Sequence, residues 1–361
     1  MDRPLLLGLF CLALLGIGTL YAAIHHGDIS IWQRQNIYWL LGAVVFLAVS
    51  FVPLRMVGLA TWPIYLLALI LLLLIPLVGD VQMGARRWLN LGIINLQPSE
   101  LMKWALMFLL AHWFASREPS SLINFSVAAV ATILPAMLIV MQPDLGTALV
   151  LLFAAATMLL ASGIRWRWVF AALAASPISL YLLWNNMHGY QKTRILSFLD
   201  PQSDPLGAGY HVIQASIAVG SGGIFGKGFL EGTQARLHFL PEQHTDFIFA
   251  VLAEEGGLMA VLLLLTLYGV IISRILTIAA RAHTRFGSLL CIGIASVFML
   301  YIFINIGMVT GMLPVVGVPL PFISYGGSAL VTMLAALGIV MRVAIESRDQ
   351  IPWQRPGSPL S

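Results

Sequence analysis

A polar turn runs directly into an apolar segment at Pro241-Glu242-Gln243-His244-Thr245-Asp246-Phe247-Ile248-Phe249-Ala250-Val251-Leu252-Ala253. The pattern predicts a membrane helix from residue 247, with the carboxylate of Asp246 at its water-facing end. Ionisable residues at membrane depth are costly to desolvate and usually mark a functional site, so Asp246 is the first candidate for catalysis. The alternative is that Thr245 or Asp246 only caps the helix, because both residue types are preferred at N-caps.

The composition around this segment is that of a membrane protein. Hydrophobic residues make up 60% of the 361 residues and charged residues only 9%, and the mean hydropathy is +0.92. These values exclude a soluble globular protein of this length and predict a polytopic membrane protein. Cys11 and Cys291 lie far apart in apolar runs, so they provide neither a disulfide framework nor metal-ligand spacing.

The apolar stretches predict an all-α bundle of about ten transmembrane helices, each long enough to cross a hydrocarbon core of ~30 Å. They lie at residues 4–24, 36–52, 59–79, 99–115, 124–141, 145–163, 167–184, 247–272, 286–309 and 327–345. We expect one transmembrane domain over residues 1–361. Its one long loop, at about 185–246, separates the seventh and eighth helices.

The arginines of the short loops predict the orientation. With the N-terminus inside, the cytoplasmic side receives Arg3, Arg55, Arg117, Arg165, Arg167, Arg274, Arg281, Arg285, Arg342, Arg348 and Arg355. Only Arg34, Arg86 and Arg87 then lie in short outer loops. The positive-inside rule therefore places both termini in the cytoplasm and the long loop outside.

In this orientation the fourth, sixth, eighth and tenth helices all begin at the outer face, where their positive dipole ends converge. The candidate cations on that face are Arg86, Arg87, Lys103, Lys192, Arg194 and Lys227. Together they suit an anionic group such as a lipid pyrophosphate. Glu100 is three residues from Lys103 on one helical face, so the two can pair, either within a substrate cavity or as a structural ion pair. Arg86 can equally be an interfacial anchor.

Other polar features leave alternatives open. The glycines of residues 220–228, with Lys227 among them, allow either backbone contact with an anion or close packing of a re-entrant segment. Glu254 and Glu255 are expected to hydrogen-bond within the bundle or to a partner helix. His244 can titrate with Asp246 or be only a solvated side chain, and no His, Asp and Glu residues recur at zinc-ligand spacing.

Several motifs together resemble the SEDS family (shape, elongation, division, sporulation). They are the segment 240–250, Gly84-Ala85-Arg86-Arg87-Trp88, Gln97-Pro98-Ser99-Glu100, Gln142-Pro143-Asp144-Leu145-Gly146-Thr147, Asn305-Ile306-Gly307-Met308 and the segment 311–328, which ends in Pro321-Phe322-Ile323-Ser324-Tyr325-Gly326-Gly327-Ser328. Residues 228–234 and 317–321 are more similar to the elongation branch of the family than to its division branch. The resemblance covers nearly the whole chain.

The resemblance implies a peptidoglycan glycosyltransferase that polymerises lipid II at the outer face of the bacterial cytoplasmic membrane. The transfer would invert the donor sugar and release undecaprenyl pyrophosphate. Asp246 matches the essential aspartate of the family, and its role stays open between a general base and a ligand of a divalent cation such as Mg or Mn. No cofactor is certain.

The resemblance also implies partners. A class B penicillin-binding protein would pack its membrane helix on the eighth and ninth helices, as part of the elongation machinery, and no nucleic acid is expected. A lipid II transporter (flippase) and a non-catalytic scaffold are the competing interpretations. Charges that collect on the outer face, without a polar path to the inner face, favour the polymerase over both.

Overall fold

The computed structural model describes residues 1–25, 27–82, 85–90, 95–186, 189–199, 208–233 and 242–349. Ten helices of 17 or more residues lie within these ranges, at the places that the apolar stretches predict. They are α1 (Arg3–Ile24), α2 (Ser30–Ser50), α3 (Leu54–Val78), α4 (Pro98–Ser116), α5 (Leu122–Met141), α6 (Leu145–Ala161), α7 (Trp166–Asn186), α11 (Ile248–Arg281), α12 (Arg285–Val309) and α13 (Gly327–Asp349).

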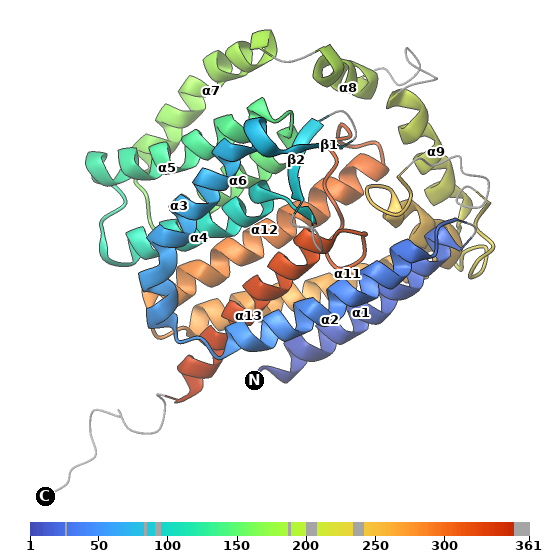
Figure 1. Cartoon of the computed structure of the whole chain (residues 1–361), viewed down its shortest axis with the longest axis horizontal. Coiled ribbons are helices and arrows are strands. Elements are labelled where there is room, and N and C mark those ends of the chain that lie inside the picture. The colour runs from blue at the N-terminus through green and yellow to red at the C-terminus, as the bar shows by residue number, and fades with distance from the viewer. Residues whose placement is uncertain are drawn as a thin grey trace, which may run out of the picture.

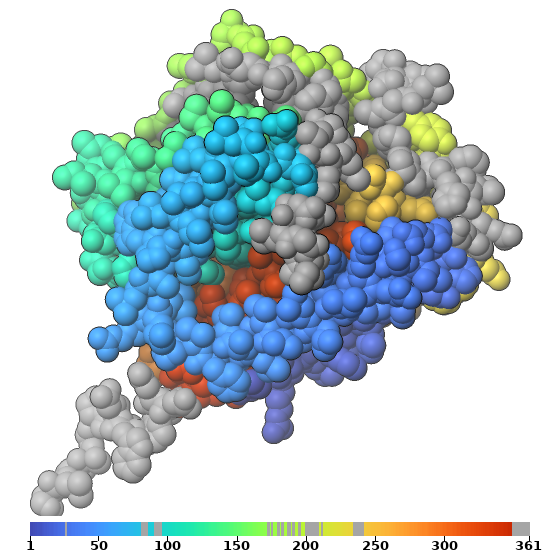
Figure 2. Space-filling model, in the orientation of Figure 1, coloured from blue at the N-terminus to red at the C-terminus, as the bar shows by residue number. Residues whose placement is uncertain are grey.

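The helices form a bundle with α12 and α13 in its middle (Figure 1). The helices α1 and α2 lie along one side, and α3 to α6 along the other. Figure 2 shows only a narrow strip of the C-terminal segment, in red, between α2 and α3. On this face, other helices thus cover most of α13.

Six described helices are long and apolar enough to cross a membrane: α1, α3, α5, α11, α12 and residues 327–348 of α13. The protein buries 72% of the apolar window in α12 and in α13, but only 28 to 39% in the other four. The outer helices instead expose large apolar side chains, for example Leu59 at 73% and Leu77 at 76%. Such apolar outer faces need a lipid environment, so this is a multi-pass membrane protein.

Two regions differ from the predicted all-α bundle with one open loop. The segment between α3 and α4 forms three short antiparallel strands, β1 (Asp80–Gln82), β2 (Ala85–Asn90) and β3 (Asn95–Leu96). The long loop contains two further helices, α8 (Gly189–Leu199) and α9 (Ala208–Ser221). Strands of two to six residues are too short to show a period in the sequence, which is why hydropathy alone misses them.

Helix α11 is not continuous, because Gly257 breaks it with φ 65° and ψ −164°. Residues 222–228 dock into the break. The N–H groups of Leu258 and Met259 donate to the carbonyls of Gly223 (2.9 Å) and Ile224 (3.1 Å). In return, the N–H groups of residues 227 and 228 donate to the carbonyls of residues 254 (3.0 Å) and 255 (3.1 Å). The loop thus satisfies the backbone groups that the break leaves without helical partners.

Candidate functional site

Asp246 lies in a turn before α11 and is partly exposed. The helix begins at Ile248 and its N-cap residue is Phe247, so neither Thr245 nor Asp246 occupies the N-cap position. The hydroxyl of Thr245 donates to the Glu242 carbonyl at 3.2 Å, within the turn itself. The geometry thus gives no support to N-capping as the reason for these two residues.

A buried amide fixes the position of Asp246. Nδ2 of Asn305, in α12, donates to the backbone carbonyl of Asp246 (3.0 Å) and to that of Val318 (2.8 Å). Asn305 is fully buried. It therefore holds the turn before α11 against the loop between α12 and α13.

That loop also contacts the turn directly. The Ser324 hydroxyl donates to the Thr245 carbonyl at 2.6 Å, and the N–H of Tyr325 donates to the His244 carbonyl at 2.9 Å. Buried Gln35 of α2 completes the assembly, because its Nε2 donates to the Ser324 carbonyl at 3.2 Å. Segments that lie far apart in the sequence thus form one unit.

The starts of four helices meet at this unit, as the predicted topology requires. A Cβ built on Gly317 would lie 3.4 Å from Oδ2 of Asp246, so the carboxylate faces the loop between α12 and α13. A Cβ on Gly146, in the first turn of α6, would lie 2.7 Å from the carbonyl oxygen of Val316 in the same loop. Gln97 Nε2, just before α4, donates to Asp144 Oδ2 at 3.1 Å. The N-termini of α4, α6, α11 and α13 are therefore linked by direct contacts.

The predicted pair of Glu100 and Lys103 is confirmed, with Nζ 2.7 Å from Oε1. Lys103 is fully buried, and Tyr301 of α12 encloses the pair by donating from Oη to the same Glu100 oxygen at 3.0 Å. The Lys103 Nζ also lies 4.1 Å from the centre of the Tyr301 ring. The other Glu100 oxygen, Oε2, is buried without a hydrogen-bond partner among the described residues. In this conformation the pair joins α4 to α12 and is closed to solvent.

Two further predicted cations, Arg86 and Lys192, contact residues other than Asp246. Nη1 of Arg86 is exposed and donates to the Pro76 carbonyl at 3.0 Å. Lys192, on α8, places its Nζ 5.7 Å from the centre of the Trp184 ring. The side chain of Arg194 lies outside the described part of the chain. These observations do not bring the cations to Asp246.

Lys227 belongs to the loop that docks on α11. Its Nζ lies 2.6 Å from Oε1 of Glu254, which is fully buried, and 2.8 Å from the Thr233 hydroxyl. A Cβ on Gly222 or Gly226 would approach a carbonyl oxygen of α11 to 2.0 Å. Of the two interpretations of the glycine-rich segment, the structure bears out close packing. Glu254 and Glu255 hydrogen-bond to this loop.

His244 adjoins Asp246 in the turn and is half-buried. Burial lowers the pKa of its imidazole below the usual 6.5, and the nearby carboxylate of Glu242, at 3.9 Å from Nε2, offsets this in part. His244 is therefore neutral at neutral pH. In this state it can accept or donate one hydrogen bond but adds no positive charge to the site.

A metal centre finds little support in the arrangement of side chains. Within the described ranges, no three His, Cys, Asp or Glu side chains cluster as metal ligands would. Asp246 could supply one carboxylate to a divalent cation, but the further ligands would have to come from carbonyls, substrate or water. We therefore derive no chemical step through a metal.

Sequence reasoning did not single out Gln35, which has only a weak signal as a polar residue at the edge of an apolar stretch. An amide within a membrane helix is the pattern that would have selected it. Arg87, one of the candidate cations, donates from Nε to the Gln142 carbonyl at 3.0 Å, and its guanidinium also donates to the Pro143 carbonyl, which ties β2 to the start of α6.

This architecture defines a class: a multi-pass α-helical membrane protein with a carboxylate site where four helix N-termini meet. The chain belongs to the family of cell cycle proteins that comprises FtsW, RodA and SpoVE, whose sequence model matches residues 4–349. The predicted resemblance to the SEDS family is thereby confirmed.

Relatives and solved structures agree over almost the full chain. The peptidoglycan glycosyltransferase MrdB of Escherichia coli K12 is 45% identical, over 95% of this chain and 93% of that protein. A chain from a structure described as the coordination of polymerization and crosslinking by a peptidoglycan synthase complex superposes with a TM-score of 0.83, at 34% identity and 96% and 98% coverage. The crystal structure of the rod shape determining protein RodA of Thermus thermophilus gives 0.73, at 30% identity and 98% coverage of both chains.

Proposed function

We propose that this protein is a peptidoglycan glycosyltransferase that polymerises lipid II at the outer face of the bacterial cytoplasmic membrane during cell elongation. The observation that carries the proposal is the position of Asp246. Asp246 is partly exposed, and a buried amide holds its backbone carbonyl at the junction of four helix N-termini. The E. coli relative, named as a peptidoglycan glycosyltransferase, supports the reaction class.

In the proposed reaction, the 4-hydroxyl of an acceptor sugar attacks the anomeric carbon of the donor. The new glycosidic bond forms as the bond to the pyrophosphate breaks, so the anomeric configuration inverts. Asp246 takes the proton of the attacking hydroxyl, and undecaprenyl pyrophosphate leaves with the bonding electron pair. The positive ends of α4, α6, α11 and α13 favour the departing anion.

We assign the candidate cations to two proposed roles. Arg86, Lys192 and Arg194 are proposed to contact the pyrophosphate. Lys103 and Lys227 each pair with a buried glutamate, so their proposed role is to position the helices and the loop around the site. Glu100 acts with Lys103, and neutral His244 is available for a hydrogen bond to a substrate hydroxyl.

The proposed partner is a class B penicillin-binding protein, which crosslinks the strands. Its membrane helix would pack on α11 and α12, whose outer faces expose large apolar side chains, including Leu258 and Leu262 of α11 and Met299 and Phe303 of α12. The similar chain from a peptidoglycan synthase complex supports such an assembly. We place both termini in the cytoplasm, because the arginine-rich ends of α11 and α13 lie on the same side as the N-terminus.

The test replaces Asp246 by Asn, which keeps the size of the side chain but cannot accept a proton. We expect Asp246→Asn to reduce polymerisation of labelled lipid II, by the purified protein with its partner, by about 10²- to 10⁴-fold. The matched control is Glu242→Gln, which removes a carboxylate from the same turn and should stay active.

The products separate the competing functions. Glycan strands from the Asn variant at the parent rate would contradict the catalytic role of Asp246. Movement of lipid II across vesicle membranes by the parent protein, without strand formation, would instead show a transporter.

A further inference from the structure

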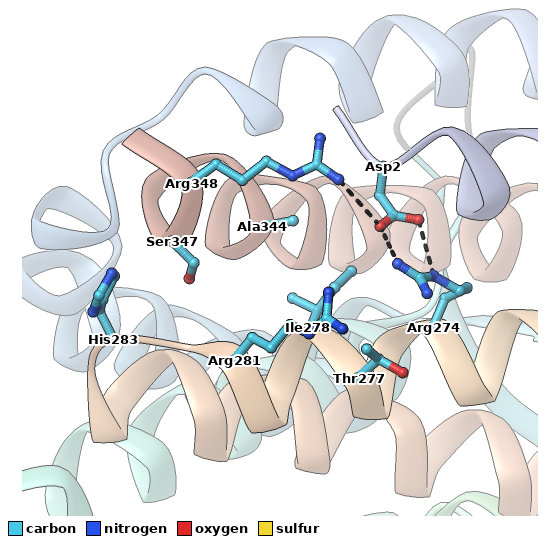
Figure 3. Close-up of a pocket in the computed structure, with 9 residues that line it drawn as sticks. All are labelled: Asp2, Arg274, Thr277, Ile278, Arg281, His283, Ala344, Ser347 and Arg348. Atoms are coloured by element: carbon cyan, nitrogen blue, oxygen red, sulfur yellow. Dashed lines mark hydrogen bonds and ion pairs between the residues drawn. The ribbon is translucent and has the colours of Figure 1, made fainter. Parts of the chain in front are cut away.

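A cavity with polar lining residues lies at the opposite end of α11 from Asp246. It has a volume of about 440 Å³ and opens between the ends of α11 and α13 (Figure 3). It is lined by Asp2, Arg274, Thr277, Ile278, Arg281, His283, Ala344, Ser347 and Arg348. The lining residues of α11 begin at Arg274 in a helix that starts at Ile248, so a rise of about 1.5 Å per residue places the cavity roughly 40 Å or more along the helix from Asp246. The cavity is therefore distinct from the proposed catalytic site.

Asp2 organises one wall of the cavity. Its buried carboxylate accepts hydrogen bonds from Nε (3.2 Å) and Nη2 (2.6 Å) of Arg274, and it lies 3.8 Å from Nη2 of Arg348. Burial raises the pKa of Asp2, but the hydrogen bonds from Arg274 and from the N–H of Leu5, with the charges of Arg274 and Arg348, outweigh it and hold the pKa below its usual value. The carboxylate is thus ionised at neutral pH and connects the start of α1 to α11 and α13.

The lining has more positive than negative charge. Three arginines face one carboxylate, so the lining carries two positive charges in excess even with a neutral His283. On α13, the carboxylate of Glu346 accepts hydrogen bonds from Arg342 and from the N–H of Leu54 in α3. It therefore does not offset the arginines of the cavity.

Arg281 is the free cation of this site. It is exposed in the last turn of α11, and it makes no hydrogen bond or ion pair with any residue that the structure describes. Figure 3 shows its side chain beside Ile278, in the space between the two helices. A guanidinium group presents its N–H donors in a planar fork that fits the oxygens of a phosphate group.

The cavity also lies beside lipid-facing surface. Leu276, between the lining residues Arg274 and Thr277 of α11, is 45% exposed. Ile278 and Ala344 form the apolar part of the cavity lining. Basic pockets between membrane helices near the membrane surface are typical sites for anionic lipid headgroups. A ligand here would keep its acyl chains along α11 while its phosphate contacts the arginines.

We propose that the cavity between the ends of α11 and α13 binds the phosphate group of an anionic ligand, with Arg281 and Arg348 as the phosphate-binding residues. The position favours a phospholipid headgroup, such as that of phosphatidylglycerol, as the source of the phosphate. Because Asp2 also contacts Arg348 and joins it to Arg274 of α11, a bound lipid would stabilise the contact between α1, α11 and α13.

The experiment measures retained lipid by native mass spectrometry of the full-length protein, released from nanodiscs of phosphatidylglycerol and phosphatidylethanolamine. We expect Arg281→Gln to weaken phosphatidylglycerol retention by about tenfold, the effect of losing one charged hydrogen-bond group. Arg281→Lys should retain part of the binding because it keeps the charge. The matched control is Arg55→Gln, which removes an exposed arginine at the same end of the bundle but outside the cavity.

The outcomes separate the sources of the phosphate. Competition by glycerol phosphate at concentrations similar to the lipid would show that a free phosphate compound is the ligand, while poor competition would show that the lipid is. Equal retention of phosphatidylglycerol by the parent, Arg281→Gln and Arg55→Gln would overturn the proposal. Equal retention of the zwitterionic and the anionic lipid by the parent would overturn it as well.

Discussion

Asn305 shows how one buried side chain can position a candidate catalytic group through the backbone, without contacting that group itself. Its amide donates to two carbonyl groups in separate segments, those of Asp246 and Val318. Removing the donor of a carbonyl in an apolar interior destabilises the folded state, because water cannot replace the lost hydrogen bond. The position of the Asp246 carboxylate thus depends on an amide in another helix.

Replacement of Asn305 by Ala should therefore affect both folding and activity. We expect the free energy of unfolding to fall by about 1–3 kcal/mol, because two buried carbonyl groups lose their donor. Strand synthesis should fall by a larger factor than this loss of folded protein explains, because the Asp246 turn is no longer fixed. Thermal unfolding and lipid II polymerisation, measured on the same preparation, check both effects.

Asn124 offers a control for this substitution. Its amide also donates to a backbone carbonyl, that of Glu118, but at an exposed position. Asn124→Ala should leave both measurements near those of the parent. A normal polymerisation rate in Asn305→Ala would contradict the positioning role.

At the scale of elements, hydropathy predicts where α11 lies but not that it breaks. Apolar residues continue on both sides of Gly257, and membrane helices often contain glycine without a break. The break exists because residues 222–228 satisfy the open backbone groups, a contact between segments about 30 residues apart that no local pattern encodes. The same reason explains why the pairing of Lys227 with Glu254 was not predicted.

Gly257→Ala should destabilise the protein by roughly 2 kcal/mol or more. The φ of 65° and ψ of −164° belong to a region that is almost restricted to glycine. A Cβ would also lie 2.3 Å from the backbone nitrogen of Gly226. The loss should appear as a lower unfolding temperature and as faster proteolysis of the loop at residues 222–233.

The same helix provides the control. A Cβ on Gly269 would meet no atom within 4 Å, so Gly269→Ala should leave stability unchanged or raise it slightly. Similar unfolding temperatures for the two alanine variants would contradict the strained break at Gly257.

At the scale of the whole molecule, the order of the long helices followed from the apolar stretches. The side of the membrane on which each helix begins stays a prediction from the loop arginines. The meeting of four helix N-termini was predictable for the same reason, because the direction of each helix is set by counting spans. The distribution of cations around the site was not predictable. Arg86, Lys192 and Lys227 each contact a neighbour that folding alone brings near.

Glu100 and Lys103 hold two parts of the bundle together, because their ion pair joins α4 to α12 through Tyr301. Lys103→Met leaves Glu100 as an uncompensated buried charge, so we expect it to destabilise the protein by about 3–5 kcal/mol. The double variant Glu100→Gln, Lys103→Met removes both charges, and it should recover most of that stability and polymerise lipid II at a rate near that of the parent. Thermal unfolding and strand synthesis of the two variants decide whether the pair is structural or contacts the substrate. A double variant that folds normally but does not bind lipid II would show that the pair contacts the substrate, in a conformation more open than the one described.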